Sequence, residues 1–134
     1  MPPQDYFGRS IPFLDLLGVV PRSIAPGAAE VVLPFRPELT NSTGVLHGGM
    51  LMSTLDFAMS AAARGDDPDG WIVATIDMTT SFVAGGRGEL TVRARTLRAG
   101  RSIVFCEAEA RDEAGELVAK ASGSFSRRRR AESS

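Results

Sequence analysis

The residues of this chain best suited to chemistry lie in one short stretch, from Asn41 to Asp56. Asp56 carries the only charge between Met50 and Ala63, in a segment with the spacing of an apolar helix. A lone carboxylate in such a helix is typical of a cleft or an interface, where it could act as a general base or a nucleophile. A solvent-facing aspartate explains the same residue equally well.

The triplet His47-Gly48-Gly49 stands at the predicted start of that helix. The first N–H groups of a helix have no acceptor within it, and two glycines let a ligand approach them closely. The triplet could therefore hold an anion or a developing oxyanion, although a plain loop-to-helix junction is the simpler interpretation of the glycines alone. His47 could be a general base or a structural residue, and Asn41 an amide donor or a turn residue.

Other common chemistries lack the residues that they need. Cys106 lies in a predicted strand without a neighbouring base, and no Gly-x-Ser-x-Gly motif is present. The run Gly85–Gly88 lies between predicted strands instead of before a helix, which argues against a phosphate-binding loop. One cysteine and one histidine exclude an internal disulfide and argue against a protein-built metal site.

The composition favours a single small domain, because the chain has 134 residues with 43% hydrophobic and 23% charged residues. No apolar run approaches the ~18 residues of a membrane helix, and the start lacks the pattern of a secretory signal. We therefore expect a cytoplasmic protein without a membrane partner. The net charge is -1, and it divides into a nearly neutral body and a short basic tail with four arginines, Arg127 to Arg130. Because the basic residues do not cover a folded face, no nucleic-acid partner is expected.

The elements that must position these residues follow from hydrophobic spacing. Apolar residues at helical intervals predict a long helix over His47–Ala63, and a shorter helix is expected after Pro12. Alternating residues predict six strands: Val19–Ala25, Ala28–Pro34, Trp71–Val83, Glu89–Leu97, Ser102–Arg111 and Glu116–Ser126. The domain is expected to span residues 1–126, with a basic, disordered tail over residues 127–134.

One long helix must cover about six strands, so we expect the sheet to curl around it. Short connections with glycine, the first at Gly85–Gly88, predict that the last four strands pair as successive antiparallel hairpins. Ile103 and Phe105 fall on the face away from the helix, where their exposure would favour an oligomer. Small residues are expected on the face toward the helix, at Ala74, Ala94, Ala108, Ala119 and Ala121.

A resemblance to a known family rests on one set of residues: Asn41, Gly44, His47, Gly48, Gly49 and Asp56, with nine residues from the histidine to the aspartate. This set resembles the hotdog-fold acyl-CoA thioesterases of the phenylacetate-pathway (PaaI-like) type. The resemblance extends over residues 12–126 and includes the stretches Asp77–Phe82 and Leu97–Ile103. It implies a hotdog fold, an α+β architecture in which a curled antiparallel sheet of five to six strands wraps a long central helix.

The resemblance also implies a role for each residue. Asp56 would be the catalytic carboxylate that activates water or attacks the thioester itself. The N–H of Gly48 would polarise the thioester carbonyl, with help from the amide of Asn41. His47 would support this loop, and the hydroxyl of Thr75 would orient the water, although some relatives carry serine at that place.

The implied substrate is an acyl-CoA, which is hydrolysed to the free acid and coenzyme A, with no separate cofactor and no metal. The implied active site straddles a homodimer, with Asn41, His47 and Gly48 from one chain and Asp56 and Thr75 from its partner, and the dimers would pair into tetramers. Coenzyme A would lie along two segments, Phe82–Arg87 and the hairpin Arg98–Ile103, whose arginines could meet its phosphates or simply be solvated. The residues implied to bind substrate and coenzyme are Gly49, Phe82, Val83, Arg87, Arg98, Gly100, Arg101 and Ser102.

Two other functions stay open. A hotdog enoyl-CoA hydratase would need an Asp/His dyad at a different spacing, and a non-catalytic acyl-CoA sensor would not need Asp56. Aromatic and aliphatic acyl groups fit the sequence equally well. Four methionines are candidates for an apolar acyl pocket, although core or interface positions explain most of them: Met50, Met52, Met59 and Met78.

Overall fold

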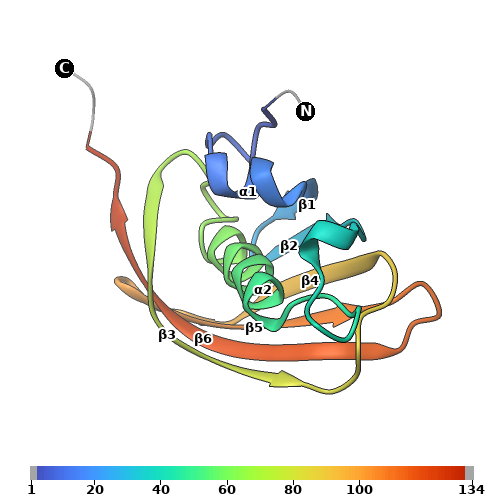
Figure 1. The fold of residues 1–134 in the computed structure, drawn as a ribbon. Coiled ribbons are helices and arrows are strands. Elements are labelled where there is room, and N and C mark those ends of the chain that lie inside the picture. Colours follow the sequence, from blue (N-terminus) through green and yellow to red (C-terminus); the bar gives the residue numbers. More distant parts are fainter. Residues whose placement is uncertain (1–2, 132–134) are drawn as a thin grey trace.

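A curved six-stranded antiparallel sheet wraps one long helix in the computed structural model, which describes residues 3–131 (Figure 1). The strand order across the sheet is β1-β2-β4-β5-β6-β3. This arrangement confirms the predicted α+β architecture. The elements in chain order are α1 (Pro12–Leu17), β1 (Val20–Ala25), β2 (Ala28–Leu33), a 3₁₀ helix (Pro37–Leu39), α2 (Gly48–Ala63), β3 (Trp71–Phe82), β4 (Leu90–Ala99), β5 (Ile103–Arg111) and β6 (Leu117–Arg129).

The central helix α2 consists largely of alanine, leucine and methionine, which are strong helix formers. It begins after His47, whose ring caps the first turn, and it ends at Arg64. Gly65 follows because a Cβ at that position would lie 2.1 Å from the carbonyl oxygen of Ala25, at the end of β1. Within the described residues, no helix has the length and apolar character needed to cross a membrane.

The core lies between α2 and the concave face of the sheet (Figure 1). The predicted apolar stripe of the helix is buried, and so are four of the five alanines expected to face it. The exception is Ala74, which is exposed because Val73 packs against the core at that end of β3 and strand alternation turns Ala74 to the other face. The buried small residues on the sheet are Ala94, Ala108, Ala119 and Ala121.

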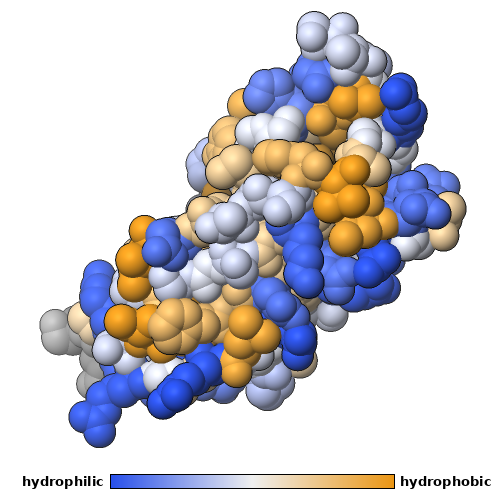
Figure 2. Space-filling view, turned by 90° about the horizontal axis from the view of Figure 1, so that it is seen from below, coloured by the Kyte–Doolittle hydropathy of each residue, from blue (hydrophilic) through white to orange (hydrophobic). Residues whose placement is uncertain are grey.

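The convex face of the sheet leaves several large apolar side chains in solvent. Leu97, Ile103 and Phe105 are 53%, 43% and 47% exposed, as the strand alternation predicted for the last two. Figure 2 looks onto this side from below the sheet and shows apolar groups separated by hydrophilic side chains.

One predicted hairpin is wrong. β4–β5 and β5–β6 are antiparallel neighbours, but β3 pairs with β6 along its whole length and not with β4. The segment with Gly85–Gly88 therefore crosses from the edge of the sheet to its centre. The glycines serve close packing there: a Cβ on Gly85 would lie 2.9 Å from Val45, and one on Gly86 would lie 3.1 Å from Leu46.

The predicted domain end at residue 126 is also too early. β6 continues to Arg129, so the expectation of a disordered tail is wrong for residues 127–129. Arg127 is only 8% exposed, because its guanidinium donates to the carbonyl oxygens of Gly100 and Ala63 and to the carboxylate of Asp66. The end of the predicted tail, residues 132–134, lies outside the described residues.

Candidate functional site

His47 fixes the start of α2. Its ring atom Nδ1 accepts a hydrogen bond from the backbone N–H of Gly49 at 3.0 Å, and the backbone N–H of His47 donates to the carbonyl oxygen of Leu39 at 2.8 Å. Nδ1 is thus used as a helix cap, which leaves only Nε2 for other chemistry. The geometry agrees with the structural interpretation of His47 and with the supporting role that the resemblance implies.

Gly48 is the first residue of α2, so its N–H has no acceptor inside the helix. The ring of Phe82 lies against it, since a Cβ on Gly48 would be 3.3 Å from two ring carbons. The absent side chain keeps the backbone accessible beside an aromatic wall. A carbonyl oxygen could approach the positive end of the helix dipole at this point.

The side-chain oxygen of Asn41 organises the loop before the helix. Oδ1 accepts from the backbone N–H and the hydroxyl of Thr43, at 2.9 and 2.8 Å, and from the N–H of Val45 at 3.3 Å. This is the turn role considered from the sequence. The amide nitrogen Nδ2 is a separate group, so a donor role toward a ligand stays a prediction.

The crossing segment after β3 lies beside this loop. The N–H of Leu46 donates to the carbonyl oxygen of Gly86 at 2.9 Å. Together with the contact between Gly48 and Phe82, this brings one of the two predicted coenzyme segments, Phe82–Arg87, next to the start of α2. Phe82 and Val83 are 52% and 58% exposed, so their apolar surfaces are available to a ligand.

Asp56 and Thr75 form a second centre. The hydroxyl of Thr75, on β3, donates to Asp56 Oδ1 at 2.6 Å, a length typical of a hydrogen bond to a carboxylate. Asp56 lies eight residues beyond Gly48 on the same helix, about 12 Å along its axis. Within one chain the helix start and the carboxylate therefore cannot act on the same carbonyl group.

The second predicted coenzyme segment, Arg98–Ile103, lies at the other end of the sheet. It ends at Ile103, which pairs with Ser126 of β6, whereas Phe82 pairs with Ala119. Seven residues of extended strand separate these positions on β6, about 24 Å. The structure of one chain therefore keeps Arg98 and Arg101 well apart from Arg87.

A groove beside Asp56 was not predicted from the sequence. Its walls come from α1 with the residue before it and from one face of α2, and it encloses about 260 Å³. One signal could have found it, because Ser53, Asp56 and Ser60 form a polar stripe at i, i+3 and i+7 on a helix that is otherwise apolar. The lining residues are Ile11, Phe13, Leu14, Ser53, Asp56, Phe57 and Ser60.

The methionines contribute little to this groove, and none of them lines it. Met50 and Met59 are buried in the core, Met78 is half-buried and Met52 is 37% exposed. The core interpretation thus fits Met50 and Met59. Cys106 is also a core residue, and its burial raises the thiol pKa to about 12, which removes it as a nucleophile.

Comparisons with known proteins agree with this architecture. The family model of the thioesterase superfamily matches residues 43–119. A relative from Saccharolobus solfataricus, provisionally named an esterase, is 31% identical over 123 residues, which cover 91% of this chain and 87% of the relative.

Solved structures extend the likeness to the whole fold. A conserved protein of Pseudomonas aeruginosa is 36% identical, with a TM-score of 0.82 over 87% of this chain and 93% of the other. The PaaI protein from the phenylacetic acid degradation operon of E. coli has a TM-score of 0.82 over 88% and 85% of the two chains, and its 23% identity shows the shared fold.

These likenesses confirm the hotdog fold that the sequence predicted. The match to the superfamily supports the hydrolysis of thioesters as the general activity. The helix start with a free N–H and the carboxylate held by a hydroxyl suit that reaction. This chain belongs to the thioesterase superfamily.

Proposed function

We propose that this protein is a PaaI-like thioesterase that hydrolyses acyl-CoA esters to the free acid and coenzyme A. One observation carries the proposal: Asp56 is held by the Thr75 hydroxyl at 2.6 Å beside a groove with apolar walls. Such a groove suits an acyl chain, and the carboxylate at its side suits attack on the carbonyl carbon of the thioester.

The proposed site needs two subunits, because Gly48 and Asp56 lie about 12 Å apart along one helix. The free edge of β3 could join the two subunits. One side of β3 pairs with β6, and no strand lies on its other side in the described chain. A free edge of 12 residues is well suited to pair with a second copy, and a two-fold axis makes that pairing antiparallel.

Antiparallel pairing would also unite the coenzyme segments. It sets the Trp71 end of the partner's strand against the Phe82 end of this one. The hairpin Arg98–Ile103 lies at the Trp71 end, where the backbone N–H of Arg127 donates to the carbonyl oxygen of Ser102. The hairpin of one protomer would thereby approach the segment Phe82–Arg87 of its partner, and arginines from both could hold the phosphates of one coenzyme.

In the proposed mechanism, the thioester carbonyl oxygen accepts a hydrogen bond from the N–H of Gly48, with Asn41 Nδ2 as a second donor. Asp56 takes a proton from water while the water oxygen bonds to the carbonyl carbon. The C–S bond then breaks, and coenzyme A leaves as its thiolate. Attack by Asp56 itself, through a mixed anhydride that water then opens, is an alternative with the same products.

The test is release of free thiol from short, medium, long and aromatic acyl-CoA esters. We expect turnover by the wild type and a loss in kcat of about 10²–10⁴-fold for Asp56→Asn. Glu38→Gln is the matched control, because that carboxylate is 70% exposed on the 3₁₀ helix and its ion pair with Arg36 is long, at 3.9 Å. Binding of the esters without turnover would instead support the acyl-CoA sensor.

Mixed dimers test the shared site. Asp56→Asn and Gly48→Val should each be inactive alone, because each removes one half of both sites. After the two are denatured and refolded together, heterodimers would hold one intact site, and activity should return to about a quarter of the wild-type value. No recovery, with mixed dimers demonstrated by mass, would place both residues in one subunit's site.

A further inference from the structure

The groove beside Asp56 continues into a second hollow with different chemistry. The two share Ile11, Phe57 and Ser60, and each encloses about 260 Å³. Beyond the shared residues, the walls no longer include α1 and instead include two arginines, a serine and three apolar residues of β3. The second hollow adds Arg9, Ser10, Arg64, Trp71, Ile72 and Val73.

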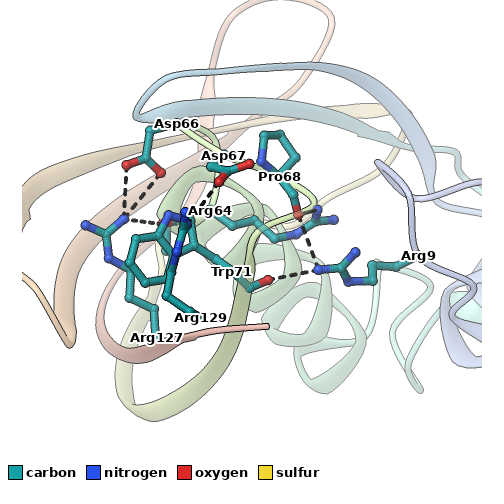
Figure 3. A network of polar contacts seen from close by, with 9 residues as sticks. Arg9, Arg64, Asp66, Asp67, Pro68, Trp71, Arg127 and Arg129 are labelled. Atoms are coloured by element: carbon teal, nitrogen blue, oxygen red, sulfur yellow. Dashed lines mark hydrogen bonds and ion pairs between the residues drawn. The ribbon is translucent and has the colours of Figure 1, made fainter. Parts of the chain in front are cut away.

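The guanidinium groups of Arg9 and Arg64 lie at this second hollow, the far end of the groove from Asp56. Both donate to backbone carbonyl oxygens instead of carboxylates (Figure 3). Arg64 donates to the carbonyl oxygens of Tyr6, Phe7 and Pro68 at 2.8–2.9 Å. Arg9 donates from Nη2 to the carbonyl oxygen of Trp71 at 2.8 Å and shares Pro68 with Arg64. In the described part of the chain, neither arginine forms an ion pair.

The positive charge at this end is therefore only partly balanced. Arg64 is 5% exposed, and its pKa is lowered first by burial and then by the charge of Arg9, while Asp69 and Asp5 act in the opposite direction. An anion that bound beside Arg64 and Arg9 would relieve the repulsion between the two guanidinium groups.

Two buried hydrogen-bond donors without acceptors also indicate a missing ligand. Within residues 3–131, four buried side-chain atoms lack a hydrogen-bond partner, and two of them are on residues that line this hollow: Arg9 Nη1 and Trp71 Nε1. Buried donors without acceptors are costly, and they are rare in native structures unless a ligand or water completes them. Both groups can only donate, so the missing group must be an acceptor.

We propose that the far end of the groove binds a carboxylate at the distal end of the acyl group, so that the substrates are thioesters of dicarboxylic acids. This inference rests on the proposed function and names its substrate class. Arg64 lies eight residues beyond Asp56 on α2, about 12 Å away along the helix. A chain that reaches from one to the other is of medium length, with its apolar middle against Ile11 and Phe57.

The experiment compares two acyl-CoA esters of equal medium length, one ending in a methyl group and one in a carboxylate. We expect the wild type to prefer the carboxylate in kcat/KM by about tenfold to a hundredfold, the effect of hydrogen bonds to a charged group. Arg9→Gln should reduce this ratio to near one, and Arg9→Lys should retain part of it. Because both esters meet the same sample, the ratio does not depend on the folded fraction.

Arg93→Gln is the control for the loss of a charge, since Arg93 pairs with Glu30 on the surface at 2.6 Å. It should leave the ratio as in the wild type. A wild-type ratio near one, with both esters hydrolysed, would overturn the carboxylate site and leave the proposed function standing. If neither ester is hydrolysed, the proposed function falls, and calorimetric binding of both esters to Asp56→Asn decides whether the groove prefers the carboxylate.

Discussion

Replacement of Thr75 by valine tests how Asp56 is held. The exchange keeps the shape of the side chain but removes the hydroxyl that donates to Asp56 Oδ1 at 2.6 Å. Hydrogen bonds to charged groups contribute about 1.5–3 kcal/mol. Since Thr75 is exposed and Asp56 is half-buried, we take the lower end of this range. That value corresponds to about a tenfold change in rate, because a factor of ten in rate equals about 1.4 kcal/mol.

We therefore expect Thr75→Val to lower kcat about tenfold with little change in KM, because the hydroxyl orients the carboxylate and not the substrate. Thr75→Ser keeps the donor and should stay near the wild-type rate. Thr79→Val, on the same strand, is the control for a lost hydroxyl. Steady-state thiol release measures all three. Full kcat in Thr75→Val, or an equal loss in Thr75→Ser, would refute the positioning role.

Three further outcomes follow from burial and close contacts. Arg127→Ala should lower the free energy of unfolding in urea by about 3 kcal/mol, because it leaves the buried acceptors of the guanidinium without a donor. Arg129→Ala should lower it by less than about 1 kcal/mol, because the side chain of Arg129 is 61% exposed. Equal losses in the two variants would contradict this reasoning. Cys106 has a raised pKa in the folded state, so its contribution to stability is complete below pH 9.0 and is lost as the pH rises toward about 12. Cys106→Ala should therefore unfold with a slope in alkali shallower by about 1.4 kcal/mol per pH unit, unless the thiol ionises freely in the fold. Gly48→Ala should lower kcat/KM by about tenfold or more, since the new Cβ would meet the Phe82 ring at 3.3 Å; an unaltered value would show that this approach is not used.

The fold was largely predictable because its elements are locally consistent. The helix over His47–Ala63 and the six strands emerge from periodicity, and the alternation in β5 correctly assigns Phe105 outward and Cys106 inward. The pairing of β3 was not predictable in this way. A short glycine-rich link is compatible with both a hairpin and a crossing, and the choice depends on β6, more than thirty residues later.

In the candidate site, too, features that depend on a local pattern were predictable, and features that depend on distant segments were not. The helix start at His47 and the carboxylate at Asp56 could be identified because each belongs to a local pattern. The groove was missed because its apolar walls, Ile11 and Phe57, come from separate elements and look like ordinary core residues, and only the polar stripe on α2 indicated it. Arg127 was misjudged because a run of arginines normally signals a solvated segment, and only the tertiary structure supplies the carbonyls that bury it.

The place of β3 beside β6 also governs how the chain can be made. β3 emerges during synthesis long before its partner, because Arg129, which pairs with Trp71, follows it by 58 residues. At about 5–20 residues per second, the 47 residues from Phe82 to Arg129 take roughly 2–9 seconds. Throughout that interval the nascent chain carries a 12-residue strand with both edges unsatisfied. Release of the chain before β6 is complete should thus produce aggregates, and a chaperone that covers β3 would protect the growing polypeptide.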